Sequence, residues 1–174
     1  MEQYKVVPDA VDEVPPLVAE VTWPSGVKAE LGNILTPTQV KDLPKVTFKA
    51  EEGALYCIVM TDIDCGPMTE CLHWILTDVK NGDSSTGKDH TVFIGSGPPE
   101  NTGLHRYVFL VFRQPNNFKV KEAKRGRNFD SRIKWSARKF ALDNNLGKAE
   151  AGNFYRAEFD SYVPILHKEV GIKV

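Results

Sequence analysis

The sequence predicts a mainly β fold in one domain, residues 1–174, and three observations carry this prediction. The length suits a single domain with a substantial core. Short apolar or alternating runs recur along the chain between Gly, Pro and Asn turn signals, as in β-rich proteins. Helix signals are few and come after residue 130. We expect about eight or nine strands and late, peripheral helices.

The N-terminal part is expected to form short strands. Residues 18–23 and 27–31 flank Pro24-Ser25-Gly26, a pattern typical of a β-hairpin. Residues 46–49 alternate between apolar and polar side chains, which indicates a half-buried strand.

Three continuous apolar runs, at residues 55–60, 72–76 and 107–112, are expected to be central strands. Strands that are buried on both faces lack alternation, and these runs lack it. Residues 153–159 alternate and predict one further strand.

The helices are expected near the C-terminal end. Asp130-Ser131 can cap a helix that ends near residues 144–147. Residues 163–170 predict a short helix with Pro in its first turn, and residues 116–129 predict a long mobile loop. The apolar stripe of the first helix is Ile133, Ala137, Phe140 and Ala141.

Composition narrows the function classes. The formal net charge of −1 gives no drive toward nucleic acid, and no apolar run approaches a membrane span. The first residues lack the apolar core of a signal peptide, and three cysteines show no metal-finger spacing. We therefore expect a reduced, cytoplasmic monomer that needs no cofactor. Residues 113–139 are basic, which suits an anionic lipid surface or an acidic partner, although a solvated face is the simpler interpretation.

The stretch 95–107 carries the first chemical signal. Its glycines and prolines fix the backbone path and lead into a strand that begins with a His-Arg-Tyr triplet. Alternation along a strand places His105 and Tyr107 on one face and Arg106 on the other. Exposed backbone N–H groups beside these donors suit an anion. The alternative is a tight connection whose histidine is structural.

A second signal lies at the end of the first buried strand. Asp62 and Asp64 are two residues apart, so we expect them to share a face, and His73 opens the next buried strand. Neighbouring carboxylates raise the pKa of a histidine and can bind a cationic group. The alternative is turn aspartates and a histidine packed beside Trp74. Cys65 and Cys71 flank this loop, and a structural role is favoured over a redox switch.

These segments resemble the phosphatidylethanolamine-binding protein family, which includes the Raf kinase inhibitor proteins. The resemblance rests on Asp62-Ile63-Asp64, His73, Gly95–Pro99, Gly103–Val108 and the segment 154–164. It implies a central antiparallel sheet packed on a smaller sheet, with few peripheral and C-terminal helices. It also implies a small pocket for phosphate or a phosphorylethanolamine head group. The implied ligand-binding residues are Asp62, Asp64, His73, Gly97, His105 and Tyr107, with Pro67, Trp74 and His167 at the rim.

Three features depart from the family pattern. Ile63 replaces a proline, the segment between Asp64 and His73 is shorter, and His167 stands where animal members often carry a tyrosine. A histidine at this rim position would titrate near pH 6.5.

We expect binding of a phosphorylated small molecule or phospholipid head group rather than catalysis, because no nucleophile with an activating base is apparent. One alternative is an inhibitor of a kinase or protease that acts through protein contact, with peripheral membrane contact as a further option. A less favoured alternative is a metal-dependent hydrolase that uses Asp62, Asp64, His73 and His105 as ligands. No metal site is otherwise expected.

Overall fold

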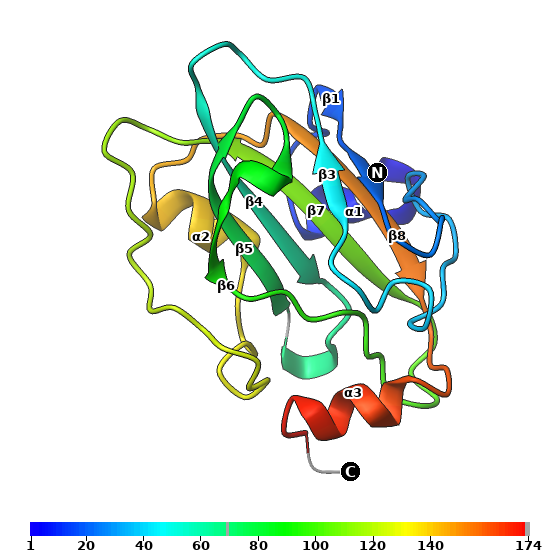
Figure 1. Cartoon of the computed structure of the whole chain (residues 1–174). Coiled ribbons are helices and arrows are strands. Elements are labelled where there is room, and N and C mark those ends of the chain that lie inside the picture. The colour runs from blue at the N-terminus through cyan, green and yellow to red at the C-terminus, as the bar shows by residue number, and fades with distance from the viewer. Residues whose placement is uncertain (69, 173–174) are drawn as a thin grey trace.

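The computed structural model describes residues 1–68 and 70–172 (Figure 1). The strands are β1 (Leu17–Val18), β2 (Glu20–Thr22), β3 (Lys45–Thr47), β4 (Leu55–Asp62), β5 (Cys71–Lys80), β6 (Lys88–Thr91), β7 (His105–Arg113) and β8 (Ala151–Ala157). The helices are α1 (Val6–Asp9), α2 (Ala137–Asp143) and α3 (Val163–Glu169), with single 3₁₀ turns at Glu2–Tyr4, Gly66–Met68 and Ser84–Thr86.

Six of the strands form the large sheet, in the order β1-β8-β7-β4-β5-β6, and β2 pairs with β3 in a small sheet. Neighbouring strands of the large sheet are antiparallel except for β1 and β8, which run parallel. The mainly β fold with a large and a small sheet is therefore confirmed, and the large sheet is mixed rather than wholly antiparallel.

Both faces of the central strands are buried, as their continuous apolar runs predict. One face carries Met60, Trp74 and Phe109 and packs against Val21 and Val46 of the small sheet. The other face packs against helices, since Val59, Ile75 and Leu110 share a cluster with Val6 of α1 and Phe140 of α2. In Figure 1 the small sheet and α1 accordingly lie on opposite sides of the large sheet.

The predicted hairpin forms, but its second arm is shorter than expected: the Trp23 N–H donates to the Val27 carbonyl and the Ala29 N–H donates to the Val21 carbonyl. Residues 27–31 contribute a single bridge, from Lys28 to Thr22, and the main partner of β2 is β3. The backbone leaves the pairing direction at Leu31 and Gly32, which have φ values of 50° and 110°. Gly32 is required there, because a Cβ would meet the Phe154 ring at 2.8 Å.

The helix predicted from residue 130 starts later. Ser136 caps α2, accepting a hydrogen bond from the Lys139 N–H. The preceding residues instead pair with the start of β5: the Leu72 N–H donates to the Arg132 carbonyl, and the Trp135 N–H donates to the Glu70 carbonyl. Helix α3 is confirmed. Residues 116–129 form a loop, as expected, and its mobility stays a prediction.

Arg132 is an exception to the solvated interpretation of the basic stretch. Its side chain is fully buried and donates to the carbonyls of Leu72, His73 and Val92 at 3.3, 3.0 and 2.7 Å. Burial and the neighbouring Arg125 and Arg127 lower its pKa to about 10. The guanidinium thus fastens the 126–133 segment to the backbone around His73.

Candidate functional site

A cavity of about 750 Å³ opens where the ends of β4, β5 and β7 meet the 94–102 loop and α3. The polar or charged residues that line it are Asp62, Asp64, His73, Thr102, His105, Tyr107, Asp130 and His167, and the apolar ones include Ile94, Pro67, Pro99, Phe129, Ile133, Leu166, Val170 and Ile172. Eight of the nine predicted site residues therefore line one cavity.

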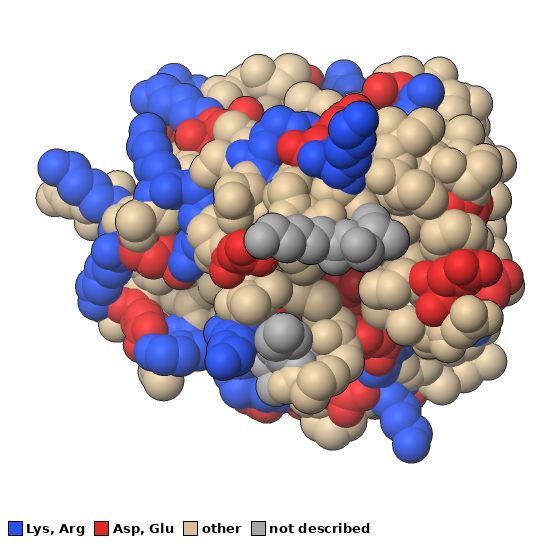
Figure 2. Space-filling model, turned by 90° about the horizontal axis from the view of Figure 1, so that it is seen from below, with Lys and Arg blue, Asp and Glu red and all other residues tan. Residues whose placement is uncertain are grey.

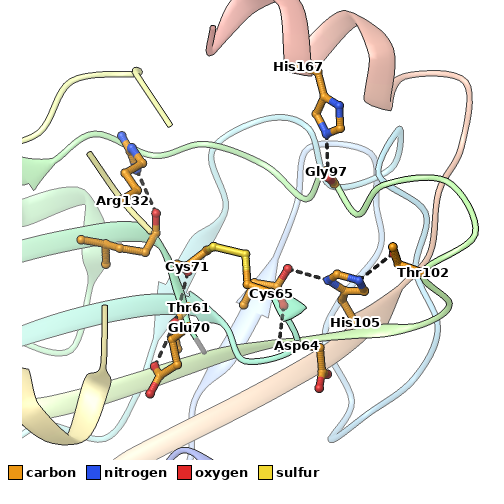
Figure 3. Close-up of a disulfide and its surroundings, with 12 residues drawn as sticks. Thr61, Asp64, Cys65, Glu70, Cys71, Gly97, Thr102, His105, Arg132 and His167 are labelled. Carbon is orange, nitrogen blue, oxygen red and sulfur yellow. Dashed lines mark hydrogen bonds and ion pairs between the residues drawn. A yellow bond between two sulfur atoms is a disulfide. The ribbon is translucent and has the colours of Figure 1, made fainter. Parts of the chain in front are cut away.

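His105 forms a hydrogen-bonded chain with Asp62 and Thr102. Its Nδ1 lies 2.8 Å from Asp62 Oδ2. Its Nε2 lies 2.8 Å from Thr102 Oγ1 (Figure 3). Burial alone would lower the pKa of His105, but the hydrogen bond and charge of Asp62, with the charge of Asp64, raise it above its usual value. Both ring nitrogens therefore have partners within the chain. His105 orders the cavity floor and has no nitrogen free for the direct ligand contact that the resemblance implies.

Asp64 does not share a face with Asp62. The strand ends at Asp62, the chain turns, and the Asp64 N–H donates back to Asp62 Oδ1 at 2.9 Å. The Asp64 carboxylate instead accepts from Arg106 Nε and Nη2 at 2.8 and 2.7 Å. Burial opposes ionisation of Asp64, but these bonds and the charge of Arg106 hold its pKa below the usual value. Arg106 lies on the opposite face from His105, as alternation predicts, and supports the loop from behind.

His73 is a neutral ring in the wall of the cavity. Its Nδ1 lies 3.1 Å from the Ile94 carbonyl oxygen, which assigns the proton to Nδ1 and leaves Nε2 as an acceptor. Burial lowers the pKa of His73 to about 4, although the charge of Asp62 opposes this shift. The ring meets the edge of Tyr107, with ring centroids 5.2 Å apart.

The hydroxyl of Tyr107 has no hydrogen-bond partner within the part of the chain that the structure describes. The side chain is completely buried, and burial followed by the charge of Asp62 raises its pKa well above the usual value. It therefore remains a protonated donor, near the Asp62 carboxylate and the backbone of Gly97. A buried hydroxyl without a partner is unfavourable, so this donor is available to a molecule that enters the cavity.

The predicted rim residues separate into two groups. Pro67 lines the cavity, and His167 donates from Nε2 to the Gly97 carbonyl at 2.8 Å (Figure 3). Gly97 packs closely against α3, since a Cβ there would lie 3.0 Å from Leu166 and 3.4 Å from His167 Nε2. Trp74 is the exception: it lies outside the cavity lining and donates from Nε1 to Asp89 at 2.8 Å. A register shift between β4 and β5 at His73 places Trp74 on the same face of the sheet as Met60 and Tyr107.

Sequence reasoning missed Thr102 and the apolar wall of the cavity. Thr102 lies three residues before His105 in the glycine-rich stretch, so its position offered a signal. The wall residues come from the 129–133 segment and from α3, and only the tertiary packing brings these segments together.

Cys65 and Cys71 form a disulfide, with their Cα atoms 5.9 Å apart (Figure 3). The bond joins the loop after β4 to the first residue of β5, and Cys65 and Pro67 in this loop line the cavity. The expectation of a fully reduced chain is therefore wrong, and the choice between a structural role and a redox switch for this pair stays a prediction. Cys57 is a free, buried thiol.

Two properties of the described residues, 1–68 and 70–172, bear on the other function classes. These residues contain no cluster of three His, Cys, Asp or Glu side chains arranged to hold a metal ion. The four residues named for the hydrolase alternative are divided, because Arg106 takes the Asp64 carboxylate. No helix in these ranges has the length and apolar character needed to cross a membrane.

The mixed sheet, the small sheet packed on one face and the cavity at the strand ends define a β domain with a ligand-sized cavity. The model of the phosphatidylethanolamine-binding protein family matches residues 25–158. The chain therefore belongs to this family.

Two relatives are similar over most of this chain. A 26 kDa secreted antigen of Toxocara canis is 34% identical over 166 residues, which are 88% of this chain and 61% of the relative. A putative odorant-binding protein A5 of Drosophila melanogaster is 29% identical over 174 residues, covering 97% of this chain and 83% of the relative. The chain thus spans less than two thirds of the Toxocara protein.

Solved structures share the fold. A phosphatidylethanolamine-binding protein from Plasmodium vivax superposes with a TM-score of 0.77 at 21% identity, covering 91% of this chain and 95% of the other. A carboxypeptidase Y inhibitor in complex with its cognate proteinase superposes with a TM-score of 0.73 at 22% identity, covering 91% and 93%.

The cytoplasmic location expected from the sequence is contradicted. The two relatives are named as a secreted antigen and an odorant-binding protein, which points to an extracellular location. The Cys65–Cys71 disulfide agrees, because such bonds persist in oxidising compartments.

Proposed function

We propose that the cavity binds a phosphate-bearing small anion or phospholipid head group of the phosphorylethanolamine type. The observation that carries the proposal is the buried Tyr107 hydroxyl, which has no hydrogen-bond partner among the described residues and lines the cavity near the Asp62 carboxylate and the Gly97 backbone. A phosphate oxygen accepts hydrogen bonds and would give this hydroxyl donor its partner.

The charges around the cavity favour a monoanion. Neither lysine nor arginine is among the described residues that line it, and the Asp62 carboxylate is paired with His105. A phosphodiester or a singly charged phosphate held by hydrogen bonds fits such a site better than a dianion, which would need a cation. His73 Nε2 is an acceptor for an ammonium or hydroxyl group of the same ligand.

The hydrogen-bonded chain of Asp62, His105 and Thr102 places a carboxylate, an imidazole and a hydroxyl in the order of a catalytic triad. Its proton positions nevertheless favour binding over catalysis. The Thr102 hydroxyl donates to the Pro99 carbonyl at 2.7 Å. The raised pKa of His105 favours the imidazolium, which cannot act as a base. The chain therefore orders the 99–105 loop that shapes the cavity.

Titration of the protein with phosphorylethanolamine, glycerophosphorylethanolamine and inorganic phosphate, followed by amide chemical shifts, tests this proposal. We expect shifts confined to residues 62–73 and 94–107, with ethanolamine as a control that lacks phosphate. Shifts spread over other surfaces, or none, would contradict it.

A second candidate function is inhibition of a protease, because this chain shares its fold with a carboxypeptidase Y inhibitor that was solved with its proteinase. An assay of carboxypeptidase Y and of secreted serine proteases, with and without phosphorylethanolamine, tests it. Unchanged protease activity at an excess of the protein would remove this candidate.

The basic stretch supports a kinase or membrane partner less than the sequence suggested. Arg132 is buried, and Arg125, Arg127 and Arg138 pair with acidic side chains. Figure 2 shows lysine and arginine side chains gathered mainly on the left of the face that carries α3, where Figure 1 has the 116–130 loop. A kinase partner and a peripheral membrane contact remain predictions.

A further inference from the structure

We infer that the cavity contains an apolar subsite for one hydrocarbon chain, so that its ligand is a single-chain amphiphile rather than a free head group. The inference that this ligand carries a phosphate group rests on the proposed function. The chain-binding part rests on separate observations, namely the size of the cavity and the composition of one of its walls.

The cavity is larger than a head group requires. Its volume of about 750 Å³ lies in the range that protein cavities offer to drug-sized ligands. Phosphorylethanolamine is a much smaller molecule and would leave most of this space unfilled. A ligand that fills the cavity must therefore extend beyond the polar floor.

The rest of the cavity is lined by an apolar wall. Leu166 and Val170 of the α3 region form a buried cluster with Ile94, and Phe129 and Ile172 pack against this cluster. Ile133, from the segment that Arg132 fastens, lines the same cavity. Phe129, Ile133 and Ile172 remain partly accessible, so their side chains can contact a ligand.

This wall is continuous with the polar floor. The Phe129 ring lies 6.4 Å from the His73 ring, measured between centroids, and Leu166 lies directly against Gly97. A molecule whose head reaches Tyr107 therefore has its remaining atoms beside the wall.

The charge next to the apolar wall favours a hydrocarbon chain over a second phosphate group as the occupant of this subsite. The charged residue next to the wall is Asp130, which would repel a second phosphate such as that of a nucleotide. Apolar surface removed from water is instead stabilising, in proportion to the area that is buried.

The test measures affinity against chain length. Glycerophosphorylethanolamine serves as the head group alone. It is compared by calorimetry with lysophosphatidylethanolamines whose acyl chains have about six to ten carbons, kept below their micelle-forming concentrations. We expect the affinity to rise about three- to four-fold per buried methylene group. Equal affinity along this series, with glycerophosphorylethanolamine still bound, overturns the apolar subsite and leaves the proposed function standing.

A matched pair of variants locates the effect. Ile133→Asn should abolish the gain with chain length and leave affinity for glycerophosphorylethanolamine unchanged. Ile165→Asn, on α3 but 56% exposed and outside the cavity lining, should change neither. Ile172→Asn is the second cavity variant in case Ile133→Asn fails to fold. A chain gain that survives both cavity variants overturns the inference.

Monoacylglycerols of the same chain length distinguish the two proposals. If they bind as tightly as the lysophospholipids, the apolar subsite stands and the phosphate head group of the proposed function fails. If neither series binds, both proposals fail.

Discussion

His105 Nδ1 lies 2.8 Å from Asp62 Oδ2, and each side chain is only 5% exposed. Because Asp62 raises the pKa of His105, this pair adds stability that is fully present below the unfolded pKa and is lost as pH rises through the folded pKa. Asp62→Asn should therefore reduce the free energy of unfolding by about 3 kcal/mol near pH 6, and by clearly less near pH 9. Urea unfolding at both pH values measures this difference.

Asp9→Asn is the control for this variant. Asp9 also forms an ion pair, with Arg106, but its side chain is 43% exposed, so its loss should cost at most about 1 kcal/mol. An equal deficit for Asp62→Asn at the two pH values would contradict the assignment of the pH dependence to His105.

Tyr107→Phe should separate binding from stability. The Tyr107 hydroxyl has no partner among the described residues, so its removal should leave the free energy of unfolding unchanged within about 0.5 kcal/mol. Affinity for glycerophosphorylethanolamine should fall about ten-fold, because a hydrogen bond to a charged group is lost. Calorimetric titration of the variant measures this loss.

Tyr155→Phe is the matched variant. Its hydroxyl shares a hydrogen bond with Ser96 and does not line the cavity, so it should lose about 1 kcal/mol of stability. Its ligand affinity should remain close to that of the parent. The opposite assignment, with Tyr155 controlling affinity and Tyr107 controlling stability, would count against the proposed site.

His73 should make the protein less stable in mild acid. Burial lowers its folded pKa to about 4 from 6.5, so the unfolded chain binds a proton first as pH falls. Stability should therefore decline between pH 6.5 and 4 by up to about 3 kcal/mol and then level off with respect to this group. His105 adds little slope there, since below pH 6.5 it is protonated in both states.

Because carboxylates also titrate in this window, the measurement is the difference between the parent and His73→Asn. The gap between their unfolding free energies should narrow as pH falls from 6.5 to 4. A constant gap would show that His73 is not buried in its neutral form.

The Cys65–Cys71 bond should stabilise both the fold and the cavity rim. It closes a short loop, since the two residues are six apart in sequence, and replacing them by serine and alanine should cost about 2 kcal/mol. Mass spectrometry after alkylation in denaturant should find one reactive thiol, that of Cys57, and three after reduction. Three reactive thiols without reductant would contradict the disulfide.

The central strands and α3 could be predicted because their signal is local. The apolar runs of β4, β5 and β7 need no knowledge of their partners, and neither does the glycine-rich stretch that ends in His105 and Tyr107. Trp74 follows His73 directly but lies outside the cavity lining, and the register shift between β4 and β5 at His73 has no local sequence signal.

The errors concern residues whose surroundings come from distant parts of the chain. Arg132 resembles its solvated neighbours in sequence, and only the carbonyls of Leu72, His73 and Val92 make its burial possible. The Asp64 carboxylate pairs with Arg106 on the other face of the sheet, because β4 ends at Asp62 and the chain turns before Asp64. Likewise β2 pairs with β3, a more distant segment that the local hairpin signal does not reveal.

The placement of α3 has a thermodynamic consequence. Leu166, His167 and Val170 form one side of the cavity, and the other side comes from the sheet and the 94–102 loop. Local opening of α3 and release of the ligand are therefore linked equilibria. A bound ligand stabilises α3 against local opening, and this stabilisation increases with the affinity of the ligand. Substitutions on the inner face of α3 will then alter affinity without contacting the polar head of the ligand.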